Sequence, residues 1–246
     1  MKRLVILMMA AMALAACQKD VPTATAEVDE TEKQQLQPAE EGAIVIDWVD
    51  FVQFEGNHYT AVDTSVLSEK NGVGRKVGEV GFKVADNINS TNYQVKNGDA
   101  AFWEKGTALY EVKKMPDFLA VKDEQEVNGY RLYLAEEAEG NFPRHFKDVE
   151  LDRVKAVEFY TGEQTPELLN RITKGEMEEF KELLTKDVEP QARDANRPDP
   201  ELYRMILYTD EPFAHAFYLY SENGQWLWYP WDEEFLPDAF EKFVQP

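Results

Sequence analysis

The sequence predicts an α+β protein in which a β-rich small barrel or sandwich domain is followed by a β-α-β-β-β-α domain. Residues 43–135 contain short runs of β-branched and aromatic residues separated by turn signals, which is typical of small barrels and sandwiches. An amphipathic helix pattern follows a capping box at Thr173–Glu176. Near the C-terminus, Asn223-Gly224 predicts an aromatic hairpin, and Pro237 predicts the start of a final helix.

Turn residues divide the β-rich domain into strands. The segment Ile44-Val45-Ile46 leads to a first strand, and Glu55-Gly56-Asn57 predicts the hairpin that follows it. Asn128-Gly129 predicts a second hairpin. The further strands that we expect are Lys76–Val84, Ala108–Val112, Phe118–Lys122 and Tyr130–Leu134.

The second domain is expected at residues 151–246, after a linker at 136–150. In the capping box, Thr173 should accept from the amide of Glu176, whose carboxylate should reach back. The helix that follows places Met177, Phe180, Leu183 and Leu184 on one face. Strands are expected at Val154–Tyr160, Leu202–Tyr208, Ala214–Tyr220 and Trp226–Tyr229, and the final helix should turn Phe240, Phe243 and Val244 inward.

The N-terminus has the features of an export signal. Lys2 and Arg3 precede an apolar run from Leu4 to Ala16, a combination typical of secretory signals. The run has 13 residues, whereas a membrane-spanning helix needs about 20. The residues Leu14-Ala15-Ala16-Cys17 resemble the lipobox of bacterial lipoproteins.

This resemblance implies that residues 1–16 are a signal peptide and that Cys17 is diacylated and becomes the membrane anchor. Two or more acyl chains hold a protein stably at a membrane. Gln18 stands where an aspartate directs inner-membrane retention in enteric bacteria, so the outer membrane is expected if the cell has two membranes. The alternative is an ordinary secretory signal beside an unrelated cysteine.

Residues 17–42 are expected to form a lipidated, disordered acidic tether, because they are rich in Pro, Thr, Gln and Glu and contain no aromatic residue. Loss of residues 1–16 removes two of the 26 basic residues and none of the 47 acids, which changes the net charge from −21 to −23. This charge disfavours nucleic acid and anionic lipid head groups as partners. Because Cys17 is the only cysteine, we expect no disulfide and no redox role.

Short motifs in both domains resemble segments of uncharacterised extracytoplasmic lipoproteins of Firmicutes. In the first domain these are Asn97-Gly98-Asp99-Ala100, Lys105 to Tyr110, and Leu119-Ala120-Val121. In the second they are the Val157–Tyr160 strand, Ile172-Thr173 and the final hairpin and helix. The resemblance implies the location and the domain layout, and it carries no activity.

Recognisable catalytic or metal motifs are absent from the sequence. The three histidines, His58, His145 and His215, lie far apart, and no metal-ligand spacing occurs. We expect His215 to be a hydrogen-bonded structural residue and His58 to face water. The four serines lack the context of a nucleophile; they are Ser65, Ser68, Ser90 and Ser221. No metal and no cofactor are therefore expected.

Carboxylate pairs are harder to dismiss, because 47 acids guarantee chance pairs. Asp47 and Asp50 flank Trp48, and Asp232-Glu233-Glu234 follow Trp231. Two acids across a sugar-binding cleft would favour a glycosidase. Calcium at Asp194, Asn196 and Asp199 is a further option, although that loop lacks the glycine and terminal glutamate of an EF-hand.

The aromatic hairpin is the candidate ligand-binding site. Because strand residues alternate between faces, Trp226 and Trp228 share one face, while Leu227 and Tyr229 share the other. One face must pack on helices, and the other can expose aromatic rings that stack on a sugar or a peptide. The alternative is that these rings stabilise the sheet through cross-strand pairs. The candidate residues are Tyr220, Trp226, Trp228 and Trp231.

These observations predict a non-catalytic, extracytoplasmic, membrane-anchored lipoprotein that binds an envelope protein, a peptide or a cell-wall component such as a glycan. The first alternative is a cell-envelope hydrolase that uses paired carboxylates. A purely structural or inhibitory envelope protein is the second.

Overall fold

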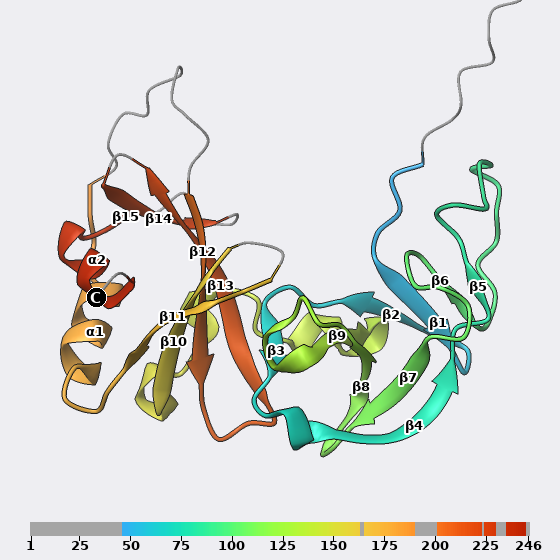
Figure 1. Cartoon of the computed structure of the whole chain (residues 1–246), viewed down its shortest axis with the longest axis horizontal. Coiled ribbons are helices and arrows are strands. Elements are labelled where there is room, and N and C mark those ends of the chain that lie inside the picture. Colours follow the sequence, from blue (N-terminus) through green and yellow to red (C-terminus); the bar gives the residue numbers. More distant parts are fainter. Residues whose placement is uncertain (1–45, 163–164, 190–200, 223, 230–234, 245–246) are drawn as a thin grey trace, which may run out of the picture. The chain divides into compact units, whose positions relative to one another are not determined.

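The described part of the chain is built around two β-sheets (Figure 1). The structure is a computed structural model, which describes residues 46–162, 165–189, 201–222, 224–229 and 235–244. These residues belong to one compact unit of the chain, Ala43–Pro246. The predicted α+β class is confirmed, since strands predominate and short helices accompany them. The predicted domain boundaries stay a prediction.

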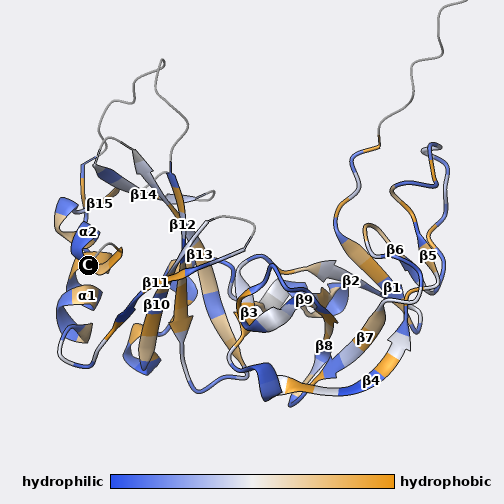
Figure 2. Ribbon diagram, in the orientation of Figure 1, coloured by the Kyte–Doolittle hydropathy of each residue, from blue (hydrophilic) through white to orange (hydrophobic). Residues whose placement is uncertain are grey.

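Sheet A is a strongly curled half-barrel (Figure 1). Its strand order is β4-β7-β8-β9-β2-β1-β6-β5, and its pairs are antiparallel except β5–β6. The strands are β1 (Phe51–Phe54), β2 (Asn57–Ala61), β4 (Val73–Glu79), β5 (Phe82–Lys83), β6 (Asp99–Ala100), β7 (Ala108–Val112), β8 (Met115–Lys122) and β9 (Tyr130–Ala135). Along β4 in Figure 2, hydrophobic and hydrophilic positions are mixed, because Val73 and Val77 lie on either side of Arg75 and Lys76.

The predicted turns of sheet A are confirmed. Glu55 and Gly56 have φ angles of 48° and 84°, as a type I′ turn between β1 and β2 requires. Asn128 and Gly129 have φ angles of 66° and 79° and belong to the 3-10 helix η2 (Val127–Gly129), which joins β8 to β9. The expected strand from Lys76 to Val84 is instead divided into β4 and β5.

Close packing inside the curl depends on Gly78. A Cβ atom at this position would lie 2.4 Å from Cε2 of Phe54, which no real contact tolerates. The pairing of β4 with β7 also shifts register near Gly78, and such irregularities increase the local twist of a strand. The glycine therefore allows the edge strand to bend over the barrel interior.

Sheet B has the order β11-β10-β12-β13-β14-β15. Its strands are β10 (Ala156–Thr161), β11 (Leu168–Ile172), β12 (Glu201–Tyr208), β13 (Phe213–Glu222), β14 (Gln225–Tyr229) and β15 (Phe235–Leu236). A further strand, β3 (Ser65–Leu67), pairs with β13 although it comes from the N-terminal region. The sequence pattern did not predict β3, β11 or β15: β3 and β15 are too short to show an alternation, and Leu168–Ile172 of β11 does not alternate.

One face of sheet B packs against α1 (Met177–Leu184), η6 (Asp238–Phe240) and α2 (Glu241–Val244). Phe180, Phe240 and Phe243 are almost fully buried, as predicted. The expected capping box is only half formed. Glu176 accepts from the backbone amide of Thr173, but the Thr173 hydroxyl also donates to this carboxylate instead of accepting from the Glu176 amide.

The predicted linker is folded. It contains η3 (Glu136–Asn141) and η4 (Phe146–Asp148), and η5 (Leu151–Arg153) follows, while η1 (Lys70–Gly72) precedes β4. Phe146 and Val149 are buried in the core beneath sheet B. Residues 136–150 are therefore a packed part of the structure, because two apolar side chains anchor them.

Candidate functional site: a tyrosine face on sheet B

The tryptophans of the predicted hairpin lie in the core. Trp226 and Trp228 are 1% and 4% exposed. The ring of Trp226 lies 5.0 Å from that of Tyr203, and Trp228 stacks on Phe146 at 4.2 Å. Burial of a large indole against helices is strongly favourable. The assignment of Trp226 and Trp228 as ligand-stacking residues is therefore wrong for this structure, while Trp231 lies outside the described residues.

The opposite face of the same hairpin carries tyrosines. Tyr220 and Tyr229 have ring centroids 4.5 Å apart, and Tyr229 is 42% exposed. The predicted alternation was correct, but the helices cover the tryptophan side. Of the predicted residues that the structure describes, Tyr220 alone remains a surface candidate.

This surface, here called the tyrosine face, extends over four strands. Tyr160, Arg204, Tyr218 and Tyr229 are cross-strand partners in a continuous row from β10 to β14. The guanidinium of Arg204 lies 5.4 Å from the centre of the Tyr218 ring, within range of a cation–π interaction. With Tyr208 and Tyr220, the face contains five tyrosines.

Glu158 fixes two of these tyrosines. Its Oε2 accepts from the hydroxyls of Tyr160 and Tyr208, both at 2.7 Å, and its Oε1 lies 3.3 Å from Nε of Arg171. Burial raises the pKa of Tyr160 to about 12 and raises that of Tyr208 further. Both phenols consequently stay protonated and act as donors, which holds this end of the face rigid.

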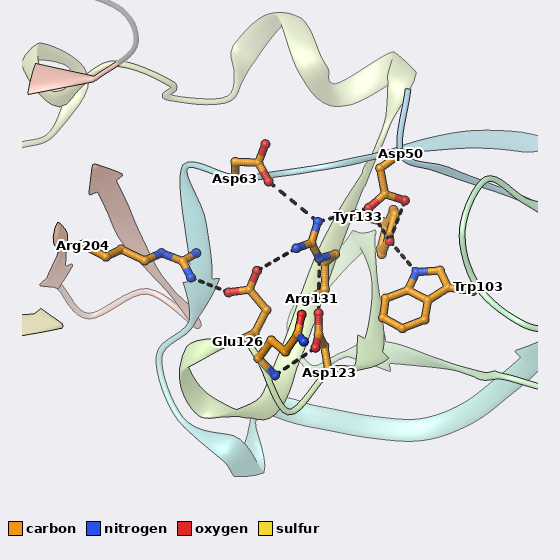
Figure 3. Close-up of polar contacts among 9 residues, drawn as sticks. Asp50, Asp63, Trp103, Asp123, Glu126, Arg131, Tyr133 and Arg204 are labelled. Atoms are coloured by element: carbon orange, nitrogen blue, oxygen red, sulfur yellow. Dashed lines mark hydrogen bonds and ion pairs between the residues drawn. The ribbon is translucent and has the colours of Figure 1, made fainter. Parts of the chain in front are cut away.

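Arg204 links the tyrosine face to sheet A. Its Nη1 lies 2.6 Å from Oε2 of Glu126, and both side chains are more than nine-tenths buried. Glu126 in turn contacts Arg131 of β9, with Oε1 3.4 Å from Nη2 (Figure 3). A buried charge needs a partner of opposite sign. The pair therefore anchors the middle of the tyrosine face to the neighbouring sheet.

Arg131 is the centre of a wider network, which Figure 3 shows. Its guanidinium reaches Asp50 at 3.1 Å and Asp123 at 3.4 Å, in addition to Glu126. Asp50 also accepts from the hydroxyl of Tyr133, which accepts from Nε1 of Trp103. Burial raises the pKa of the Asp50 carboxyl, while Tyr133 and Arg131 oppose this rise.

The predicted acid pairs do not form a catalytic arrangement among the described residues. Asp50 is held by Arg131 and Tyr133, and Asp47 is exposed. The acids 232–234 and the predicted calcium ligands at 194–199 lie outside the described residues. In the part of the chain that the structure describes, no three His, Cys, Asp or Glu side chains are grouped so that they could hold a metal ion.

The three histidines lie apart. His58 hydrogen-bonds to Gln53 at 3.1 Å and stacks on Phe51, so it is half-buried. His145 accepts from the amide of Lys147 at the start of η4. His215 is buried, but its Nδ1 has no hydrogen-bond partner among the described residues, so the expected hydrogen bond is missing.

Neither Ser65 nor Ser68 has the surroundings of a catalytic nucleophile. Ser65 pairs with His215 across β3 and β13, yet it is buried and its hydroxyl donates to the carbonyl of Thr64. Ser68 donates to the carbonyl of Glu211. Both hydroxyls thus satisfy backbone groups.

Comparison with known proteins finds no matching family model, no matching curated protein and no matching solved structure. None of the helices in the described residues combines the length and the apolarity needed to cross a membrane. Cys17, the tether and residues 44–45 lie outside the described residues. The functional argument therefore depends on the residues themselves.

Sequence reasoning missed that Tyr160, Arg204, Tyr208 and Tyr218 lie together on one face of sheet B. One signal was present: Glu158 and Tyr160 flank the core residue Phe159, and Arg204 and Tyr208 stand next to the core residues Met205 and Leu207. Aligning these residues on one face required the register between strands, which only the structure supplies.

Proposed function

We propose that this protein is a non-catalytic, extracytoplasmic lipoprotein, anchored by Cys17, that binds an envelope protein, a peptide or a cell-wall component through the tyrosine face. The observation that carries the proposal is the row Tyr160–Arg204–Tyr218–Tyr229, which ends at an exposed ring. Tyrosine is favoured at binding surfaces, because it combines a flat apolar body with a polar end and loses little side-chain entropy.

The fixed interior of the face supports this function. Glu158 and Arg204 hold their tyrosine neighbours through hydrogen bonds and a cation–π contact. Such preorganisation reduces the entropy lost when a ligand is bound. Tyr220 and Tyr229, at the hairpin end, are then the rings available to stack on a sugar or on an apolar peptide side chain.

Substitution at the exposed end of the face tests the proposal. Tyr229→Ala and Tyr220→Ala should each weaken retention of an envelope component at least about tenfold, as expected for an aromatic residue at the centre of an interface. The measurement is pull-down from envelope extracts and co-sedimentation with purified wall polymer, using the full-length chain.

Phe102→Ala is the matched control, because Phe102 is 47% exposed and lies in the loop after β6, away from the tyrosine face. It should bind like the unsubstituted chain. Equal binding by all variants, with the fold intact, would remove the tyrosine face from the proposal.

The membrane anchor is tested separately. Cys17→Ser should prevent incorporation of radiolabelled fatty acid, because the thiol is the acylation site implied by the lipobox. The chain should then lose its lipid anchor, whether or not the signal peptide is cleaved. Fractionation of the cell envelope measures this. A Cys17→Ser form that still incorporates label would contradict the anchor.

The hydrolase alternative draws less support from the described residues. Asp50, the half-buried member of the predicted Asp47 and Asp50 pair, is already bound by Arg131 and by the hydroxyl of Tyr133. A hydrolase would instead show turnover of a wall polymer that is lost when one acid is replaced.

A further inference from the structure

A polar cavity lies on the other side of β13 from the tyrosine face. His215 is an odd-numbered residue of β13, whereas Tyr218 and Tyr220 are even-numbered, and strand side chains alternate between faces. The cavity has a volume of about 440 Å³. The residues in its wall that matter here are Phe142, Asp148, Glu150, Arg153, Glu211 and His215.

His215 has unused hydrogen-bonding capacity in this wall. The residue is 4% exposed, and its Nδ1 is buried without a partner among the described residues. Its Nε2 lies 3.7 Å from Oε2 of Glu211, which is too far for a hydrogen bond. The Nε2 edge of the ring thus lies beside Glu211 in the cavity wall without a hydrogen bond to it, so a ligand group can bind between the two side chains.

The imidazole is neutral near pH 7, because burial and the nearby Arg153 lower the pKa of His215 to about 4. One ring nitrogen therefore carries hydrogen. Electrostatics favour hydrogen on Nε2, since it then points toward the Glu211 carboxylate, and the buried Nδ1 keeps only a lone pair. The 3.7 Å gap between Nε2 of His215 and Oε2 of Glu211 is thus flanked by a donor and an acceptor.

A hydroxyl group satisfies both sides of this gap. It accepts from Nε2–H of His215 and donates to Oε2 of Glu211, whose other oxygen is held by Arg153 at 3.3 Å. An ammonium group has no lone pair for the Nε2–H. A carboxylate or a sulfate has no hydrogen for Glu211 at neutral pH, and it would also face Asp148 and Glu150.

The rest of the wall extends this selectivity. Arg153, Asp148 and Glu150 offer charged donors and acceptors to further hydroxyls, while Phe142 offers an apolar ring. Ligand sites combine a few convergent polar groups with an apolar surface in this way. We propose that this cavity binds a neutral, hydroxyl-rich ligand of one or two sugar rings, held between His215 and Glu211.

This site goes beyond the proposed function, because it is separate from the tyrosine face. Its first test uses the full-length chain and the imidazole NMR resonances of its histidines. Glucose and N-acetylglucosamine are the probes, and n-butylamine and sodium sulfate represent cationic and anionic ligands. A sugar should shift the His215 resonances saturably and leave those of His58, which lies outside the cavity, unchanged.

Two results would overturn the proposal. One is that neither sugar shifts the His215 resonances. The other is that butylamine or sulfate shifts these resonances saturably while the sugars do not. Because this observation is made on the unsubstituted chain, it does not depend on whether a variant folds.

Substitutions provide the second test. His215→Phe keeps the ring but removes the N–H donor, and it should weaken sugar binding at least about tenfold, since a hydrogen-bonding partner of the ligand is lost. Glu211→Gln removes a charged acceptor and should weaken binding about fivefold. His58→Phe is the matched control and should bind like the parent chain.

Unchanged affinity in both folded cavity variants would contradict the site. Tyr229→Ala separates the two proposals, because it should leave sugar binding at His215 intact while it reduces binding at the tyrosine face. Each proposal can therefore fail without the other.

Discussion

Single buried side chains carry much of the chemistry of this protein, and His215 is the clearest case. Asp148, Arg153 and Glu211 are the charged groups that face it. Its pKa is about 4 in the folded chain, compared with 6.5 for a free histidine. The folded state therefore favours the neutral imidazole, and the stability that it contributes is present above pH 6.5 and is lost as the pH falls toward 4.

We expect the free energy of unfolding to fall by about 3 kcal/mol more in the parent than in His215→Phe when the pH is lowered from 7 to 4. Urea unfolding at a series of pH values measures this difference. His58→Phe should keep the parent's pH profile. An identical profile for His215→Phe and the parent would mean that His215 is accessible to protons in the folded chain.

Among the secondary-structure elements, the β13–β14 hairpin shows what a sequence pattern can predict and what it cannot. The positive φ angle of Gly224 and the alternation of faces follow from the Asn-Gly sequence and from the two-residue period of a strand. Which face is buried depends on η4 and η6, because Phe146 stacks on Trp228 and Phe240 lies 6.4 Å from Trp226. Composition alone favoured neither side.

Replacement of one aromatic residue on each face distinguishes core from surface. Trp228→Ala should lower the free energy of unfolding by about 3–5 kcal/mol, because it leaves a cavity in the core. Tyr229→Ala should change it by less than about 1 kcal/mol, as is usual for exposed positions. Chemical denaturation measures both. Similar losses for the two variants would contradict the assignment of the faces.

The contacts between sheets A and B combine a strand, an apolar cluster and an ion pair. β3 adds to sheet B through β13, and Val127 of η2 packs with Ile206 and Ala216. The Glu126–Arg204 pair lies beside these contacts and is more than nine-tenths buried. Removal of one member leaves the other without its nearest partner in a region from which water is excluded.

Arg204→Met should therefore destabilise the protein by about 3 kcal/mol and loosen the tyrosine face. Lys76→Met, which breaks the exposed Lys76–Glu79 pair, is the control and should cost less than about 1 kcal/mol. Thermal and urea unfolding provide the measurement. If both variants lose the same small amount, the buried pair does not hold the sheets.

The sequence alone predicted the α+β class, the turns at Glu55-Gly56 and Asn128-Gly129, and the buried face of α1. These features are local, because each depends on the backbone preference of a turn residue or on the period of one element. The lipobox at Cys17 is also local, and it stays a prediction.

Only the tertiary structure decided which hairpin face is exposed, that β3 joins sheet B, and that Arg204 meets Glu126 across 78 positions of the chain. The row of tyrosines and the cavity at His215 belong to the same class of feature. Each depends on the register and packing of segments that are distant in sequence, and no pattern within a single segment encodes that information.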